Sequence, residues 1–145
     1  GKTIRYLRMK QENPETVQSA INIIAADGKP KIFLLGLDEL VDFHPHYTNT
    51  FYAWDCDFRA LVESDVSRFI CFSGTVAYDA ALRLIYDGAP REKISVLPSN
   101  DNAVIAAELA KYAGENVYLI TWLKKYQSLA EYARQHAEEG VYAKA

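Results

Sequence analysis

Two carboxylates separated by a single cysteine are the first candidates for chemistry in this sequence. Asp55 and Asp57 flank Cys56 in the stretch TFYAWDCDFRAL, residues 50–61, which also holds four aromatic residues. An ionised carboxylate is costly to bury unless it finds a partner, so acids beside so much apolar surface need an explanation. Either the stretch ends a strand and its acids point to water, or one aspartate lies in a shaped site and takes part in a reaction.

The most specific reaction open to such an acid is to orient a histidine, as the third member of a nucleophile–histidine–aspartate set. The chain offers no convincing nucleophile–histidine pair of its own. Cys56 is adjacent to Asp55, so the backbone hinders their meeting through one histidine. If Asp55 is catalytic, the histidine therefore comes from another chain. The alternative is a strand-end carboxylate that caps the next helix.

Two other polar motifs have plainer interpretations. His44 and His46 form an HPH motif, but metal sites need three or four ligands and Asp42 is the only nearby acid, so we predict no metal site. Asp79 and Arg83 lie four residues apart on an expected helix, the spacing of an ordinary surface ion pair.

The chain carries no recognisable phosphate-binding loop. Neither GxGxxG nor GxxxxGK[ST] occurs. The turn FSGT at Gly74 could hold an anion at the start of the following helix, although a tight strand-to-helix turn is the favoured interpretation. On that helix, Tyr78 and Tyr86 are expected to line the core.

Composition excludes several classes of protein. The 145 residues suit one domain with one core, and a net charge of −3 gives no electrostatic footprint for nucleic acid. No apolar run nears the roughly 20 residues that a transmembrane helix needs, and the first residues lack the apolar core of a signal peptide. Two cysteines set no disulfide framework, which favours reduced thiols in a cytoplasmic protein. The missing initiator methionine before Gly1 indicates an expression remnant or the cut end of a longer chain.

The elements that must position these residues alternate between apolar strands and amphipathic helices. Strands are expected at 3–9, 31–37, 68–72, 93–97 and 117–121, and helices at 14–27, about 56–64, 75–87, 101–113 and 122–139. This alternation predicts an α/β, Rossmann-like three-layer domain with a mainly parallel sheet, formed by residues 1–145 as one unit. Ligands in such domains bind at the carboxyl ends of the strands. The long connection 38–50 leaves from such an end, and the tail 141–145 is expected to be frayed.

Five stretches, in order, resemble the C-terminal domain of the MurT family, the Mur-ligase-like subunits of lipid II isoglutaminyl synthases. They are ENPETVQSAI (12–21), LDELVD (37–42), NTFYAWDCDF (49–58), SGTVAYDAALRLIYDGAP (73–90) and VYLITWL (117–123). The resemblance covers nearly the whole chain, and WDCDF and YDAALRLIYDG carry most of its specificity. One departure is Asn49, which stands where the family usually has an acid.

The resemblance implies a division of labour between domains and subunits. In MurT-type proteins a central Mur-ligase domain binds ATP and activates the D-glutamate α-carboxyl of the lipid II stem peptide. The C-terminal domain docks a glutaminase, GatD, and is thought to lend an aspartate to its Cys–His pair. The aspartate of the WD step is Asp55 here, with Asp57 as a possible second acid. The domain alone would be inactive and hold no cofactor, because ATP and Mg²⁺ belong to the missing central domain.

Several further residues are expected to dock the partner or line the site: Asn49, Tyr52, Trp54, Phe58, Gly74, Asp79 and Arg83. Trp54 and Phe58 either pack into the domain's own core or form part of the docking face. Two other functions stay open from the sequence. One is a stand-alone α/β module that binds a small anion at the Gly74 turn. The other is the C-terminal domain of an amino-acid-adding Mur ligase, although WDCDF is not the signature of those enzymes.

Overall fold

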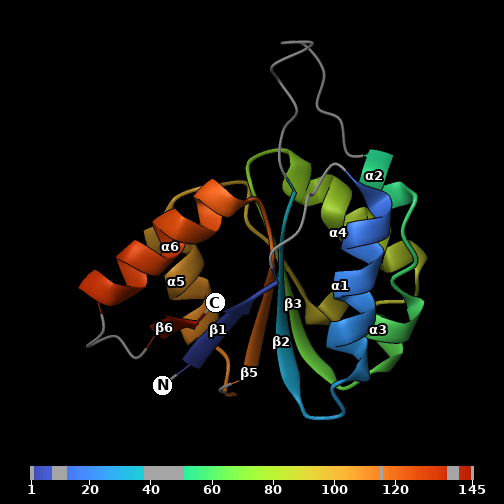
Figure 1. The fold of residues 1–145 in the computed structure, drawn as a ribbon, viewed down its shortest axis with the longest axis horizontal. Helices are drawn as coiled ribbons and strands as arrows, with labels where there is room; N and C mark the ends of the chain where they lie inside the picture. The colour runs from blue at the N-terminus through green and yellow to red at the C-terminus, as the bar shows by residue number, and fades with distance from the viewer. Residues whose placement is uncertain (1, 8–12, 38–50, 115, 137–140, 145) are drawn as a thin grey trace.

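One parallel sheet forms the centre of the computed structural model, which describes residues 2–7, 13–37, 51–114, 116–136 and 141–144 (Figure 1). Its strands are β1 (Lys2–Tyr6), β2 (Lys31–Gly36), β3 (Val66–Phe72), β4 (Ile94–Val96), β5 (Asn116–Ile120) and β6 (Val141–Lys144). Within the described residues their order is β4-β3-β2-β5-β1-β6, and every pairing is parallel.

Helices cover both faces of this sheet. They are α1 (Pro14–Ala26), α2 (Phe51–Trp54), α3 (Arg59–Glu63), α4 (Val76–Tyr86), α5 (Asn102–Ala110) and α6 (Leu123–Gln135), with a short 3₁₀ turn, η1 (Arg91–Lys93). Figure 1 shows α1, α3 and α4 on one face and α5 and α6 on the other, and the two faces bury separate apolar clusters. The predicted α/β, Rossmann-like three-layer fold is confirmed.

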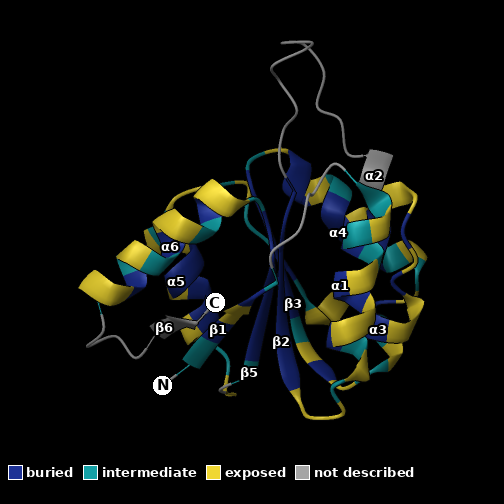
Figure 2. Cartoon of the chain, in the orientation of Figure 1, coloured by how far each residue is buried: buried dark blue, intermediate teal, exposed yellow. Residues whose placement is uncertain are grey.

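The central strand shows why the sheet needs two helical layers. All six residues of β2 are buried (Figure 2). Phe33 and Leu35 pack under α1, α3 and α4, whereas Ile32 and Leu34 pack under α5 and α6. A continuous apolar run of this kind is typical of a parallel strand that is covered on both faces.

Local signals set the start of α1 as the sequence predicts. The side chain of Asn13 accepts a hydrogen bond from the backbone N–H of Glu15 at 2.9 Å, and Pro14 occupies the first turn. The helix then buries Val17 and Ile21 against the sheet. The N-terminus of α1 lies at the carboxyl end of the strands, near α2 (Figure 1).

Two expectations about elements differ from the structure. Residues 141–144 do not fray; they form β6 and pair with β1 from Lys2↔Val141 to Arg5↔Lys144, because the open edge of β1 offers unpaired backbone groups. The short helix expected at about 56–64 is present as α3, but it begins later, at Arg59, and the preceding one-turn helix α2, which ends at Trp54, is not predicted from the sequence. The connection 38–50, with His44, His46 and Asn49, lies outside the described residues.

Candidate functional site

Asp55 directly follows the one-turn helix α2, and this helix lies near the carboxyl ends of the strands (Figure 1). It is exposed. Among the residues that the structure describes, its carboxylate makes no hydrogen bond or ion pair. The expectation that this acid ends a strand or caps the next helix is wrong, because the stretch before it is helical and α3 has no side-chain cap. Both oxygens of Asp55 are therefore available to an incoming group.

Asp57, in contrast, is engaged locally. Its carboxylate accepts hydrogen bonds from the Arg59 guanidinium at 2.7 Å and from the Arg59 backbone N–H at 2.9 Å. The side-chain bonds from Arg59, followed by the backbone bond, lower the pKa of Asp57 to about 2. The bond from the Arg59 N–H lies at the start of α3, where short-range bonds from aspartate side chains to the backbone are favoured. The geometry thus separates two acids that the sequence leaves equivalent.

The two aromatic residues singled out beside the acids have different surroundings. The side chain of Phe58 is fully buried in the core, which is the first of its two expected placements. Trp54 keeps 39% of its surface exposed, and its ring meets Tyr86 edge-on with 5.5 Å between centroids. The side chain of Tyr52 lies outside the described part of the structure.

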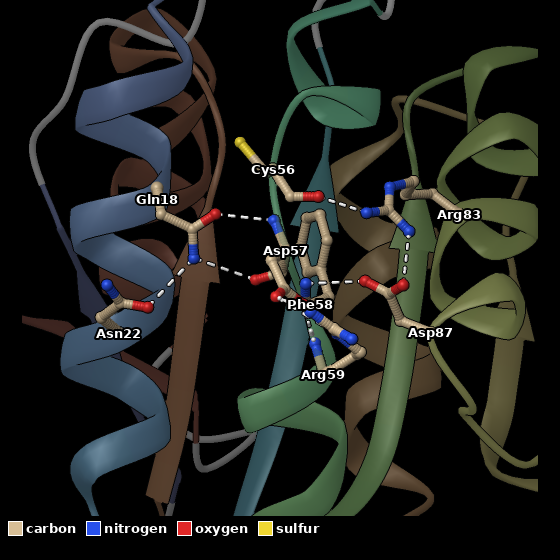
Figure 3. Close-up of polar contacts among 8 residues, drawn as sticks. All are labelled: Gln18, Asn22, Cys56, Asp57, Phe58, Arg59, Arg83 and Asp87. Carbon is tan, nitrogen blue, oxygen red and sulfur yellow. Dashed lines mark hydrogen bonds and ion pairs between the residues drawn. The ribbon is translucent and has the colours of Figure 1, made fainter.

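Arg83 is buried rather than on the surface, which corrects the interpretation of it as half of a surface ion pair. Only 8% of the residue is exposed, and its guanidinium pairs with Asp87 at 2.9 Å. It also donates to the backbone carbonyl of Ala53 at 3.1 Å. A further hydrogen bond goes to the backbone carbonyl of Cys56 (Figure 3). Asp79, the expected partner, lies half-buried in the first turn of α4. A side chain predicted to be solvated therefore holds the segment that carries Asp55.

Two further residues hold this segment, and sequence reasoning missed both. Asp87 accepts a hydrogen bond from the backbone N–H of Phe58 at 2.7 Å. Gln18, on α1, accepts from the backbone N–H of Asp57 at 2.6 Å and donates to its carbonyl at 2.9 Å (Figure 3). The spacing of four residues between Arg83 and Asp87 was a signal for one of these contacts. Nothing in the local sequence signals the contact of Gln18.

The tyrosines of α4 face solvent, which makes the prediction that they line the core wrong. Tyr78 is 57% exposed and Tyr86 is 71% exposed. With Leu82, also exposed, they recur every four residues and form one stripe along the helix, which we call the α4 stripe. The buried residues of α4 are Val76, Ala77, Ala80, Ala81, Arg83 and Leu84, half of them alanines, so this side packs inward while the tyrosines point away. Trp54 extends the stripe toward Asp55 through its contact with Tyr86.

Gly74 lies in the turn from β3 to α4, as predicted. Its φ of 59° and the φ of 89° at Ser73 fall in the left-handed region that favours glycine. The favoured interpretation of this stretch as a tight strand-to-helix turn is confirmed.

Neither cysteine is suited to act as a nucleophile. The side chains of Cys56 and Cys71 are both buried thiols that form no disulfide. Burial raises the pKa of the Cys56 thiol to about 11 and that of Cys71 to about 12, so both remain protonated near neutral pH. Among the described residues no group of three or more metal-ligating side chains occurs, and no helix is long and apolar enough to cross a membrane. Among the described residues at the carboxyl ends of the strands, the exposed carboxylate of Asp55 is therefore the feature with chemistry to offer.

Fold and site together define a Rossmann-like α/β domain that presents an unpaired acid but lacks a reactive thiol of its own. The chain belongs to the MurT ligase C-terminal family, whose model matches residues 11–127. The matched range includes α1, α2, α3 and α4, and so all the residues around Asp55. A search of the curated proteins finds no match to this chain.

Proposed function

We propose that this chain is the C-terminal domain of a glutamine-dependent amidotransferase subunit that amidates the D-glutamate of the lipid II stem peptide. In this proposal the domain docks a GatD-like glutaminase and supplies Asp55 to the Cys–His pair of that partner. Membership of the MurT ligase C-terminal family supports the Mur-ligase context. The observation that carries the proposal is the exposed carboxylate of Asp55, unpaired among the described residues yet set in a segment whose backbone is bonded on both sides.

The geometry suits a supporting acid rather than a nucleophile. In a Cys–His pair, the thiol transfers its proton to one imidazole nitrogen before the sulfur attacks the amide of glutamine. A carboxylate that accepts a hydrogen bond from the other ring N–H fixes the tautomer and stabilises the imidazolium that forms. Asp55 has both oxygens available for this bond, whereas those of Asp57 are bonded to Arg59.

Exposed apolar surface beside Asp55 supports the docking part of the proposal. Trp54 and the α4 stripe present large side chains to solvent. Aromatic residues that become desolvated in a protein interface frequently contribute most of the binding energy. Contact between Trp54 and Tyr86 links this surface to the turn that carries the acid. Docking on it would exclude water from Asp55, which strengthens a hydrogen bond to an imidazolium.

The remaining steps belong to other parts of the complex. The central Mur-ligase domain of the same protein would bind ATP and Mg²⁺ and activate the D-glutamate carboxyl, while the glutaminase would release ammonia. The domain described here would be inactive alone, and the complex would act on lipid II from the cytoplasmic side.

The test compares Asp55→Asn with Asp57→Asn in the full complex with the glutaminase. Asp55→Asn keeps the size of the side chain and removes its charge, so glutamine hydrolysis should fall by roughly 10³-fold or more while calorimetry shows unchanged assembly. Asp57→Asn is the matched control, two residues away, and should retain turnover within about threefold because its exposed pair with Arg59 contributes little. Normal glutamine hydrolysis in the Asp55→Asn complex would refute the catalytic role.

A further inference from the structure

We propose that Arg83 is a positioning residue for Asp55, acting together with Asp87 to fix the backbone on both sides of that acid. The inference rests on the proposed function and deepens it. In this proposal the buried ion pair at the end of α4, and not the docked partner, fixes where Asp55 lies.

The guanidinium of Arg83 reaches both sides of Asp55 at once. One nitrogen donates to the carbonyl of Ala53 at 3.1 Å, two residues before the acid, and another donates to the carbonyl of Cys56, the residue after it. The third nitrogen pairs with Asp87 at 2.9 Å (Figure 3). Each of the three nitrogens therefore has a partner. The planar fork links the end of α2 to the turn beyond it, with Asp55 between the two bonded carbonyls.

The same ion pair fixes the chain further along. The second oxygen of Asp87 accepts from the backbone N–H of Phe58 at 2.7 Å, so the carboxylate bridges the guanidinium and the start of α3. From the opposite side, Gln18 bonds both the N–H and the carbonyl of Asp57. Backbone groups at positions 53, 56, 57 and 58 are thus held by side chains from α1 and the end of α4.

Aromatic rings enclose the guanidinium. The central carbon of Arg83 lies 5.4 Å from the ring centroid of Trp54 and 5.5 Å from that of Phe58. Phe58 is fully buried and Trp54 is partly exposed, so the arginine couples the core to the exposed aromatic surface. Burying an ion pair contributes little net stability compared with apolar side chains of similar size, so stability alone is a weak reason for this arrangement. Fixing one conformation of the segment accounts for it better.

Pre-organisation explains how an exposed acid can serve a partner accurately. A catalytic group that is displaced by about 1 Å can lose roughly 10²-fold in rate, and a free surface loop would have to be ordered at every docking event. With its neighbours bonded, Asp55 keeps its backbone position and leaves only its side chain to adjust. The partner histidine then meets a carboxylate that is already in place.

Lysine cannot reproduce this arrangement, because a single ammonium cannot span two carbonyls and a carboxylate in fixed directions. In the full complex, Arg83→Lys should therefore lower kcat for glutamine hydrolysis by about 10- to 100-fold, with KM for glutamine changed by less than about threefold. Asp87→Asn tests the same network without altering the arginine and should lower kcat in the same direction. Arg59→Lys is the matched control, since it alters the exposed pair with Asp57 in the same segment, and should leave kcat unchanged.

A double-mutant cycle separates positioning from general structural damage. If Arg83 acts through Asp55, then Arg83→Lys has no further effect on kcat once Asp55→Asn is present. Independent, multiplying losses in the double variant would overturn the positioning role, as would a normal kcat in both Arg83→Lys and Asp87→Asn when Asp55→Asn is impaired. If Asp55→Asn itself hydrolyses glutamine normally, the proposed function fails and the role of Arg83 fails with it.

Amide hydrogen exchange on the full chain gives a readout that needs no partner. The N–H groups of Asp57 and Phe58 are bonded to Gln18 and Asp87, so Arg83→Lys should accelerate their exchange by about tenfold while amides of β2 keep the wild-type rate. Unchanged exchange at both positions would contradict the proposal that Arg83 and Asp87 fix the backbone around Asp55. Should Arg83→Lys fail to fold, the Asp87→Asn variant decides the question by the same kcat and exchange measurements.

Discussion

The last residue of β2, Gly36, has a sharp packing requirement that can be tested. A Cβ added at Gly36 would lie 2.2 Å from Cζ and 2.3 Å from Cε2 of the Phe72 ring. Carbon atoms in good contact are about 3.5–4.0 Å apart, so at least about 1.3 Å of overlap would have to be relieved. Phe72 is fully buried and pairs with Gly36 across the two strands, so the ring has little room to retreat.

Gly36→Ala should therefore destabilise the protein by about 1–3 kcal/mol, the usual cost of overpacking a core. For a chain of this size the expected fall in Tm is about 3–10 °C. Thermal unfolding followed by circular dichroism measures it. Gly28→Ala is the matched control: Gly28 follows α1 in an open position with nothing within 4 Å of its added Cβ, so its Tm should stay within about 1 °C.

A double variant attributes the loss to the ring. Phe72→Leu alone removes buried carbon and should itself lower Tm, but it makes room for the methyl group of Gly36→Ala. The two changes together should therefore cost less than the sum of their separate effects, by a coupling of about 0.5–3 kcal/mol. A Gly36→Ala protein that melts with the wild type, or strictly additive losses in the double variant, would refute the close packing of β2 against β3 at this edge.

The remaining predictions concern the exposed aromatics and one buried acid. Tyr86→Ala should weaken glutaminase binding to the full chain by about fivefold or more in calorimetry, with little change in Tm. Ile23→Ala, which changes an exposed residue on α1, is the control and should bind normally. Equal affinities for both variants would contradict docking on the α4 stripe. Burial disfavours the ionised form of Glu108, yet hydrogen bonds from Lys111, Ser95 and Tyr112 together outweigh it and lower its pKa to about 2. Because the folded-state pKa lies below the ordinary value of 4.5, Glu108 stabilises the fold above that value and loses this contribution as the pH falls toward 2. When the free energy of unfolding is measured in urea, Glu108→Gln should accordingly lose less stability over this pH range than the wild type. Identical pH profiles for the two proteins would argue against the hydrogen bonds of Lys111, Ser95 and Tyr112 to Glu108.

The order of elements could be predicted from the sequence because it depends on local patterns. Alternating apolar strands and capped helices indicated a parallel sheet with helices on both faces, and Asn13 and Pro14 marked the start of α1 correctly. Boundaries set by neighbours in space were harder to predict. β6 exists because β1 leaves an edge open, and that requirement lies more than a hundred residues away from the strand it creates.

The candidate site shows the same difference between features set by local sequence and features set by distant contacts. Asp55 and Asp57 are equivalent by residue type and spacing, and only the bonds of Asp57 to Arg59 distinguish them. The burial of Arg83 depends on carbonyls 27 and 30 residues earlier, and the contact of Gln18 with Asp57 joins residues 39 apart. A helical spacing pattern predicts which residues share a face. It cannot say which face of α4 packs against the sheet, and in the structure the face with Tyr78 and Tyr86 is the exposed one.

The position of β1 and β6 in the sheet bears on which part of the chain an isolated fragment should contain. The family match spans residues 11–127, which leaves out β1, β6 and the last turns of α6. β5 lies between β2 and β1, and its residues from Val117 to Ile120 are buried. A fragment cut at the limits of the match would turn this apolar strand into an open edge, which is a template for aggregation. The part of the chain that matches the family model is therefore shorter than the part that covers both edges of β5 in this structure.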